Sequence, residues 1–273
     1  MINLLFCGND GVFDGVMTCL LSILKRSAPD TYHVHIFTMT LTRIKPNYTA
    51  ISPLSIERLK QMLQSYNPEN KVIIHDVTAL YESQFKGCPN EGAYCSPYTL
   101  IRLFADQVKD MPDRILYLDT DIMFNRDIHL LYNQDISQVE YAAARDHYGK
   151  YLIHPHYINA GVLYFNMDKC RQTNLFGKAR EWIQKKKLMF ADQSAIIRST
   201  TKKKLLPQRF NDQKFLHKHT VVRHFSKRLF YLPYPHTENI KQYMIDKVHE
   251  KFHYDQFDDI YEEYHRWKGV SHD

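Results

Sequence analysis

Short apolar runs alternate with helix-like stretches through the first two thirds of the chain. An apolar run bounded by turn residues predicts a strand, whereas apolar residues three or four positions apart predict a helix. Ser52-Pro53 and Ser96-Pro97 are typical helix starts, since each places a capping serine before a proline. Further helices are predicted over 16–24 and 175–187. The predicted strands are 3–7, 33–39, 71–77, 114–118, 141–144, 161–165 and 221–225.

This alternation favours an α/β fold, a mostly parallel sheet with helices on both faces. The character of the sequence changes near residue 232, where aromatic and charged residues mix at helical spacing. We therefore expect a main α/β domain over 1–231, the part that would carry any active site, and a small helical tail over 232–273, packed on that domain or closing over it. A chain of 273 residues is long enough for one large domain or two small ones.

Composition excludes disordered and fibrous classes, because 44% of residues are hydrophobic, 13% are aromatic and only 9 are glycine. The net charge of +6 suits a phosphate-rich partner. The lysine runs 185–187 and 202–204 form either solvated faces or contacts with anionic lipid or substrate. No basic patch is interleaved with aromatic residues, so we expect no nucleic-acid partner.

The cysteines and the N-terminal residues indicate a cytoplasmic protein. Five cysteines form an odd set without a Cys-x-x-Cys pair, which is typical of free thiols in a reducing compartment. The first ten residues lack the basic start and long apolar stretch of a signal peptide. The apolar stretch 16–24 is too short to span a bilayer, so we expect membrane contact only peripherally, at the inner face.

The strongest chemical signal is an Asp-x-Asp pair, Asp119 and Asp121, directly after the apolar strand 114–118. Ligands of open α/β sheets bind at the carboxyl ends of strands, where these two acids are expected to lie. Hard divalent cations that also bind phosphate oxygens favour carboxylate ligands. The pair therefore predicts a metal site, and the alternative is a solvated turn that caps the next element.

Several further motifs occur in order around this pair, and together they resemble glycosyltransferase family 8. Residues 4–12 read LLFCGNDGV, a strand followed by an acidic turn, and 96–103 read SPYTLIRL, similar to the family's Ser…Tyr-x-x-Arg-Leu helix. Residues 157–166 read YINAGVLYFN, similar to the family's Phe-Asn-Ala-Gly-Val-Leu strand, and the pair Asp192-Gln193 begins a helix. The opening turn departs from the family's Asp-Asp-Asn-Tyr, because Val12 stands where the aromatic residue is usual.

The resemblance implies a GT-A fold, with a Rossmann-like mixed sheet, and a retaining hexosyltransferase that uses a UDP-sugar. Asp119 and Asp121 would hold Mn²⁺ or Mg²⁺ with a histidine, His224 or its competitor His236. The family's His-x-x-Gly-x-x-Lys motif is broken after His224, where Lys227 replaces the glycine, and Lys241 would reach the diphosphate instead.

The resemblance also implies which residues contact the donor and acceptor. Arg102, Asp192 and Gln193 would be catalytic, and an amide such as Gln193 is a poor nucleophile, which favours front-face attack assisted by the departing phosphate. For Arg102, a salt bridge to a buried acid is the alternative. The residues expected to bind the nucleotide, sugar or acceptor are Cys7, Gly8, Asn9, Asp10, Arg102, Thr120, Asp146, Asn159, Ala160, Asp192, Gln193 and Lys241.

The sequence therefore predicts transfer of a hexose from a UDP-sugar to a hydroxyl of a glycan, glycolipid or glycoprotein. One alternative is a non-catalytic module that binds a nucleotide-sugar. Another is a phosphatase of the haloacid dehalogenase type, whose Asp-x-Asp normally begins the chain and carries threonine or valine where Met123 stands.

Overall fold

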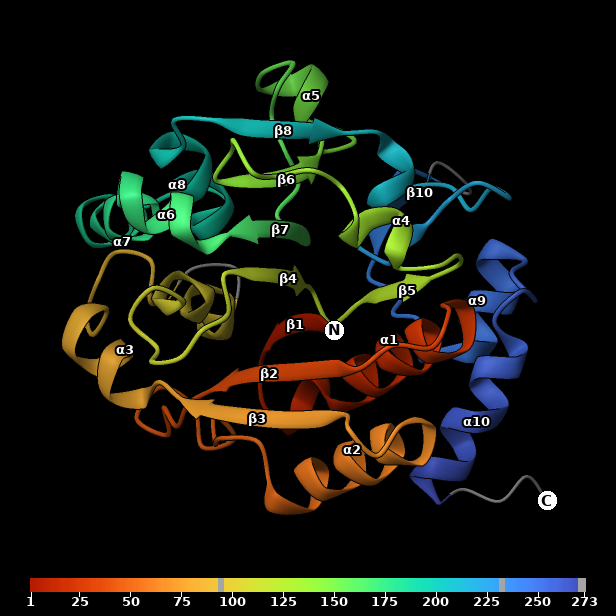
Figure 1. The fold of residues 1–273 in the computed structure, drawn as a ribbon. Coiled ribbons are helices and arrows are strands. Elements are labelled where there is room, and N and C mark those ends of the chain that lie inside the picture. Colours follow the sequence, from red (N-terminus) through yellow and green to blue (C-terminus); the bar gives the residue numbers. More distant parts are fainter. Residues whose placement is uncertain (93–95, 231–233, 270–273) are drawn as a thin grey trace.

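A seven-stranded sheet in the order β3-β2-β1-β4-β7-β6-β8 forms the centre of the computed structural model, which describes residues 1–92, 96–230 and 234–269 (Figure 1). Strands β3, β2, β1 and β4 are parallel, β7 runs antiparallel to both of its neighbours, and β6 is parallel to β8. This confirms the predicted mostly parallel α/β sheet. The strands are β1 (Ile2–Cys7), β2 (Tyr32–Thr38), β3 (Lys71–Asp76), β4 (Arg114–Leu118), β6 (Tyr141–Ala144), β7 (Val162–Asn166) and β8 (Lys203–Leu206).

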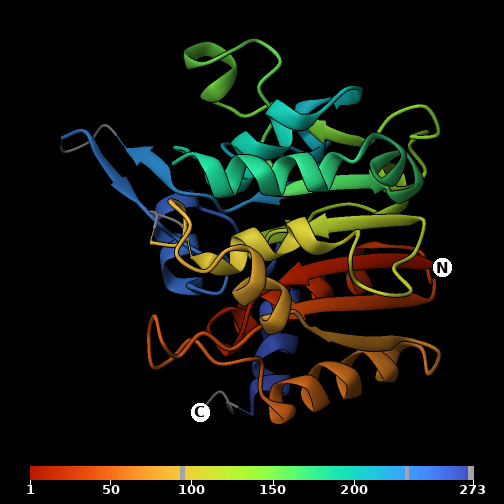
Figure 2. The ribbon, with the colours of Figure 1, turned by 90° about the vertical axis from the view of Figure 1, so that its left-hand side faces the viewer.

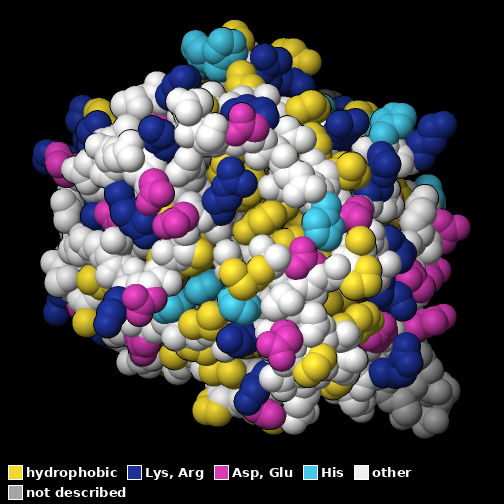
Figure 3. Space-filling view, in the orientation of Figure 1, with side chains coloured by type: hydrophobic (Ala, Val, Ile, Leu, Met, Phe, Trp, Pro, Cys, Tyr) yellow, Lys and Arg dark blue, Asp and Glu magenta, His cyan; other side chains and the backbone are white. Residues whose placement is uncertain are grey.

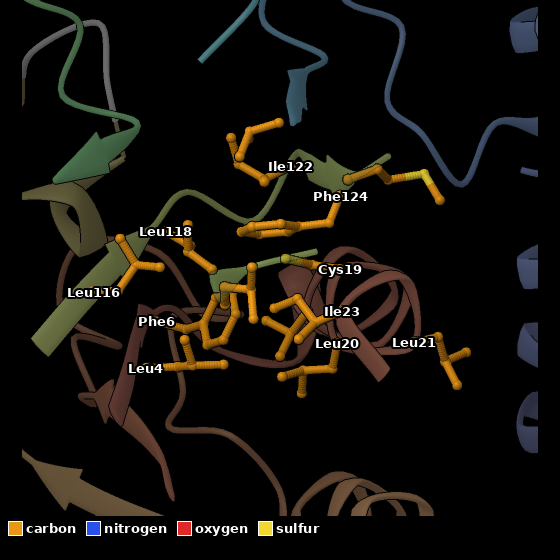
Figure 4. Close-up of a cluster of buried hydrophobic side chains, with 14 of the residues drawn as sticks. Leu4, Phe6, Cys19, Leu20, Leu21, Ile23, Leu116, Leu118, Ile122 and Phe124 are labelled. Atoms are coloured by element: carbon orange, nitrogen blue, oxygen red, sulfur yellow. The ribbon is translucent and has the colours of Figure 1, made fainter. Parts of the chain in front are cut away.

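Helices cover both faces of the sheet because successive strand residues point to opposite sides. Leu4 and Phe6 of β1 face one hydrophobic cluster, and Leu5 and Cys7 face the other. Figure 4 shows the first cluster, in which side chains of β1, β4 and β5 meet those of α1. This face carries α1 (Phe13–Arg26), α2 (Pro53–Tyr66), α9 (Ile245–Phe252) and α10 (Asp258–Lys268). The opposite face, seen in Figure 2, carries α3 (Thr78–Gln84), the 3₁₀ helix η2 (Pro97–Phe104), α6 (Met167–Thr173), α7 (Leu175–Lys185) and α8 (Ala191–Ser199).

The predicted elements agree closely with these bounds. The strands predicted over 114–118 and 141–144 have those bounds in the structure, and the Ser52 side chain caps α2 by accepting from the Ser55 N–H. The segment after Ser96 differs, since it forms a 3₁₀ helix that ends at Phe104. In this segment the Arg102 Nε–H donates to the Thr99 carbonyl, so the side chain turns inward rather than along an α-helical face.

Short elements complete the domain. β5 (Ile122–Phe124) pairs antiparallel with β9 (Val222–His224), a contact between segments 100 residues apart. A hairpin joins β10 (Arg228–Phe230) to β11 (His236–Glu238). The rest are η1 (Asp10–Val12), α4 (His129–Tyr132), α5 (Gly149–Leu152) and η3 (Gln208–Phe210).

The C-terminal region contains the expected helices, but it begins with the strand β11 where the sequence predicted a helical tail. Helix α10 lies along α1, held by ion pairs from Arg26 to Asp259 and from Lys25 to Glu263. The expected division at 231/232 lies outside the described residues and stays a prediction.

Two further observations bear on the sequence-based expectations. Cys7, Cys19, Cys88 and Cys170 carry free thiols, and Cys95 lies outside the described residues. Within 1–92, 96–230 and 234–269, no helix combines the length and hydrophobicity that a bilayer crossing requires.

Candidate functional site

The main cavity lies where the strand order reverses. β1 is paired with β2 on one side and with β4 on the other, and all three strands end at the same edge of the sheet. Ligands of open α/β sheets bind at such a switch point. A cavity of about 630 Å³ is found there, lined by residues 7–12 at the end of β1, 47–49 after β2, and 117 and 119–121 at the end of β4, with part of the segment around η2.

Asp119, Asp121 and His224 converge at this cavity. The His224 Nε2 lies 3.0 Å from Asp121 Oδ1 and 3.9 Å from Asp119 Oδ2, and one ligand atom from each residue lies within 4.8 Å of the others. The pairing of β5 with β9 places Ile122 opposite His224, which brings the histidine to the acids. Two carboxylates and an imidazole form a donor set that can hold a divalent metal ion.

Gly161 makes room for this cluster. Its carbonyl accepts from the Asp119 N–H at 2.8 Å, so the two backbones lie side by side. A Cβ at Gly161 would lie 2.4 Å from the His224 Cε1 and 2.9 Å from the Asp119 Oδ2. Any larger residue would therefore displace the histidine or the carboxylate.

A chain of side-chain amides fixes the orientation of the His224 ring. Asn159 donates from Nδ2 to the Asp146 carboxylate at 3.0 Å, which leaves its Oδ1 to accept from Asn211 Nδ2 at 2.9 Å. Asn211 then presents its own Oδ1 to the His224 Nδ1 at 2.9 Å. Because that oxygen can only accept, the His224 Nδ1–H donates to it, which leaves Nε2 facing the acids as the ring nitrogen that would bind a metal ion. The residues present therefore fit a divalent metal ion.

Lys241 adds positive charge to the same place, because its Nζ lies 2.5 Å from Asp121 Oδ2. Burial by itself would raise the pKa of Asp121, but the charges of His224 and Lys241 outweigh it and hold the pKa well below its usual range. Asp121 is therefore ionised. His236 instead pairs with Glu238 Oε1 at 3.0 Å, so the structure brings His224 and not His236 to the acid pair.

Arg102 is almost fully buried and connects Asp119 to Asp192. Its Nη2 lies 3.2 Å from Asp119 Oδ1 and 3.1 Å from Asp192 Oδ2, and its Nη1 donates to the Ala160 carbonyl at 2.7 Å. The guanidinium also stacks on Tyr117, 3.8 Å from the ring centroid. Burial raises the pKa of Asp192, and Arg102 opposes that rise. These contacts are the salt bridge considered for Arg102, and its contact with a donor sugar stays a prediction.

A second cavity has a volume of about 490 Å³. Asp146, Asn159 and Gln193 line it, and the Gln193 Oε1 accepts from the Ala160 N–H at 2.9 Å. Asp146 is held in place, since it accepts from Gln213 Nε2 as well as from Asn159. The rest of the lining is mainly apolar and aromatic: Tyr148, Leu152, Ile153, Tyr157, Met189 and Phe190.

The residues expected to bind substrate thus fall into three places. The first cavity is lined by Cys7, Gly8, Asn9, Asp10 and Thr120 together with the acid pair. The second is lined by Asp146, Asn159 and Gln193. Arg102, Ala160 and Asp192 are buried around the acid pair.

Within the first cavity, two of these side chains already bond to the protein. The Asn9 side chain donates to the Tyr98 hydroxyl and the Asn47 carbonyl, and Asp10 Oδ1 accepts from the Ser52 N–H and hydroxyl. These bonds hold the turn after β1 in shape.

Sequence reasoning missed three residues of the site. Tyr48 lines the first cavity and packs edge-on against Tyr98, with ring centroids 5.6 Å apart. Asn211 orients His224, and Gln242 donates to the Thr120 carbonyl between the two acids at 2.9 Å. Tyr48 and Asn211 lie in loops and Gln242 lies just before α9, so no periodicity marked any of them.

The fold and the cluster together define the class of protein, an α/β domain of GT-A architecture with a switch-point site that can hold a divalent metal ion. The chain belongs to glycosyl transferase family 8, whose family model matches residues 3–228. A Haemophilus influenzae protein named as a glycosyltransferase is 29% identical over 139 residues, which cover 44% of this chain and 42% of that protein.

Solved structures of glycosyltransferases share the fold. Galactosyltransferase LgtC, solved with donor and acceptor sugar analogues, has a TM-score of 0.70 at 17% identity and covers 99% of this chain and 100% of its own. GlyE of Streptococcus pneumoniae has a TM-score of 0.65 at 16% identity, covering 100% of this chain and 66% of its own. The bifunctional WbbM has a TM-score of 0.69 at 18% identity, and the match spans 97% of this chain but only 51% of WbbM.

Proposed function

We propose that this chain is a metal-dependent, retaining hexosyltransferase that moves a hexose from a UDP-sugar to a hydroxyl of a glycan, glycolipid or glycoprotein. The observation that carries the proposal is the Asp119, Asp121 and His224 cluster at the edge of a cavity of about 630 Å³. Family membership favours this activity over the phosphatase alternative.

The first cavity is proposed to hold the nucleotide diphosphate. The turn after β1 supplies backbone close to the ligand at Cys7 and Gly8, and Tyr48 supplies an aromatic face. Tyr48 takes the place of the aromatic residue missing at Val12. A nucleobase packed against Tyr48 would leave the diphosphate pointing toward Asp119 and Asp121.

Three side chains are proposed to hold the metal, with Asp119 and Asp121 as carboxylate ligands and the Nε2 of His224 as the third. A divalent ion held there supplies Lewis-acid stabilisation of the negative charge that develops on the leaving diphosphate. Lys241 supplies a fixed positive charge beside Asp121 for the same purpose. On ligand binding, we expect the Lys241 ammonium to move from Asp121 to a phosphate oxygen.

The acceptor is proposed to enter through the second cavity, because Asn159 and Gln193 line it while the neighbouring Gly161 carbonyl accepts from the Asp119 N–H and the Ala160 carbonyl accepts from Arg102. The bond from the anomeric carbon to the diphosphate oxygen breaks, the acceptor oxygen bonds to that carbon on the same face, and its proton passes to the departing phosphate. Gln193 is held by the Ala160 N–H, which suits a residue that positions the sugar without attacking it.

Incubation of the chain with a panel of UDP-sugars and Mn²⁺ tests the proposal. We expect release of UDP that chelation abolishes and that Asp121→Ala reduces by orders of magnitude, because a metal ligand is lost. Glu57→Ala, at the solvent-facing side of α2, is the matched control. Full activity in excess chelator would refute metal dependence. UDP binding without turnover of any sugar would favour the non-catalytic module, and release of phosphate from simple phosphomonoesters would favour the phosphatase.

A second arm tests the lysine. Lys241→Ala should lower kcat/KM strongly and weaken UDP binding, whereas Lys227→Ala should have less effect. If Lys227 proved essential and Lys241 dispensable, the phosphate contact would come from the residues directly after His224.

A further inference from the structure

Positive charge is concentrated in one part of the sequence. Residues 182–237 contain 13 lysines and arginines against only two acids, a net charge of +11, although the whole chain carries only +6. The two acids, Asp192 and Asp212, are 5% and 7% exposed, so they offer almost no negative surface. A second segment, residues 147–156, contains no acidic residue. In Figure 1 the strand β8 and helices α5 and α8 of these segments lie together in the upper half of the molecule.

Exposed apolar side chains project from the same region. Helix α5 stands out from the body in both Figure 1 and Figure 2, and Tyr151 and Leu152 on it are 78% and 81% exposed. Met189, in the loop that follows the lysine run 185–187, is 82% exposed. Figure 3 shows hydrophobic, histidine and basic side chains together at the top of the molecule, where α5 lies. Five of the twelve large hydrophobic residues that are exposed in the described ranges line the second cavity: Tyr148, Leu152, Ile153, Met189 and Phe190.

We propose that one face of the molecule docks on a bilayer that contains anionic lipids. This face is formed by α5, the loop 185–190, and Lys227 and Arg228, the basic residues that line the second cavity. Exposed apolar side chains surrounded by lysines suit such an interface, because the apolar side chains enter the headgroup layer and the lysines neutralise the lipid phosphates. The bilayer is favoured over nucleic acid because the two most exposed of these side chains, Met189 and Leu152, are aliphatic and offer no aromatic ring on which a base could stack.

The second cavity is lined by these exposed apolar side chains, so docking turns the cavity toward the membrane. The acceptor that it takes is then a sugar or hydroxyl carried on a lipid, with the apolar walls of the cavity covering the part nearest the bilayer. This identification of the acceptor rests on the proposed function, whereas docking itself is measurable without any transfer.

Co-sedimentation with lipid vesicles tests the docking surface. We expect the chain to bind vesicles of phosphatidylglycerol and phosphatidylcholine, and to bind pure phosphatidylcholine far more weakly. The Tyr151→Ser, Leu152→Ser double variant should lower partitioning by about tenfold or more, because it removes apolar area from the interface. Changing lysines 185, 186 and 187 to glutamine should lower it by about a hundredfold, at roughly fivefold for each charge.

Matched controls lie at the opposite end of the molecule, on α2. Leu54→Ser and Lys60→Gln change the same kinds of exposed side chain there and should leave vesicle binding unchanged. Circular dichroism and thermal unfolding of every variant report whether the fold is intact.

Three results would overturn the docking proposal: no binding to anionic vesicles, equal binding by all variants, or binding that depends on the lysines but not on Tyr151 and Leu152. The last would indicate a purely electrostatic contact with a polyanion such as nucleic acid. Vesicle binding by a chain that does not bind UDP would support the docking surface and refute the proposed function separately.

Discussion

Replacement of Asn211 by alanine tests the amide chain behind the metal cluster. Asn211 is fully buried, and its Oδ1 is the acceptor that fixes the proton on the His224 Nδ1. Loss of such a partner costs a metal site about 10- to 100-fold in affinity, which is about 1.4 to 2.8 kcal/mol. It also leaves a buried N–H unpaired, at a further cost of about 1–3 kcal/mol in the free energy of unfolding. Asn159 keeps the Gly161 N–H as a donor to its Oδ1, so the change is local.

The assay is calorimetric titration of Mn²⁺ into the chain in the presence of saturating UDP. The Kd for Mn²⁺ should rise about 10- to 100-fold in Asn211→Ala, and excess Mn²⁺ should restore kcat/KM, because the ligands themselves are intact. Asn211→Asp keeps an acceptor for His224 but gives up the donor to Asn159, so its loss should be smaller. Asn133→Ala, at an exposed position, is the control. An unchanged Mn²⁺ affinity in folded Asn211→Ala would refute the reasoning.

Two further predictions concern UDP recognition and stability. Tyr48→Ala should weaken UDP binding about tenfold while Tyr48→Phe should not, since base stacking on an aromatic ring contributes about 1–3 kcal/mol; equal affinities would exclude Tyr48 as the base platform. Burial, with the neighbouring His75 and His33, lowers the pKa of His35 to about 4. The unfolded histidine takes up its proton near 6.5, so stability is full above that pH and falls by about 3 kcal/mol as the pH drops toward 4. Urea unfolding at pH 7 and pH 5 should show about 2 kcal/mol of this loss, and His35→Gln should flatten the slope; an unchanged slope would contradict it.

The sequence predicted β1, β2, β3 and β4 well, because each is a separate apolar run, whereas β8, which overlaps the lysine run 202–204, was not predicted as a strand. Buried strands such as β4 and β6 read as continuous apolar runs, which fixed their bounds. Strand direction is not encoded in such a run. The antiparallel insertion of β7 between β4 and β6 therefore had no local signal, although its residues were identified as a strand.

The site was predictable as far as its residues follow strands or match the family motifs. Asp119 and Asp121 end a strand, and their place at a ligand-binding edge follows from that alone. His224 was one of two candidates, and only the pairing of β5 with β9 distinguishes them, because it sets Ile122 opposite His224 across 101 intervening residues. Both strands are three residues long, and their pairing depends on tertiary packing that no local pattern records. The tautomer that aims His224 at the acids depends in turn on Asn211, a loop residue whose role arises only from its contacts.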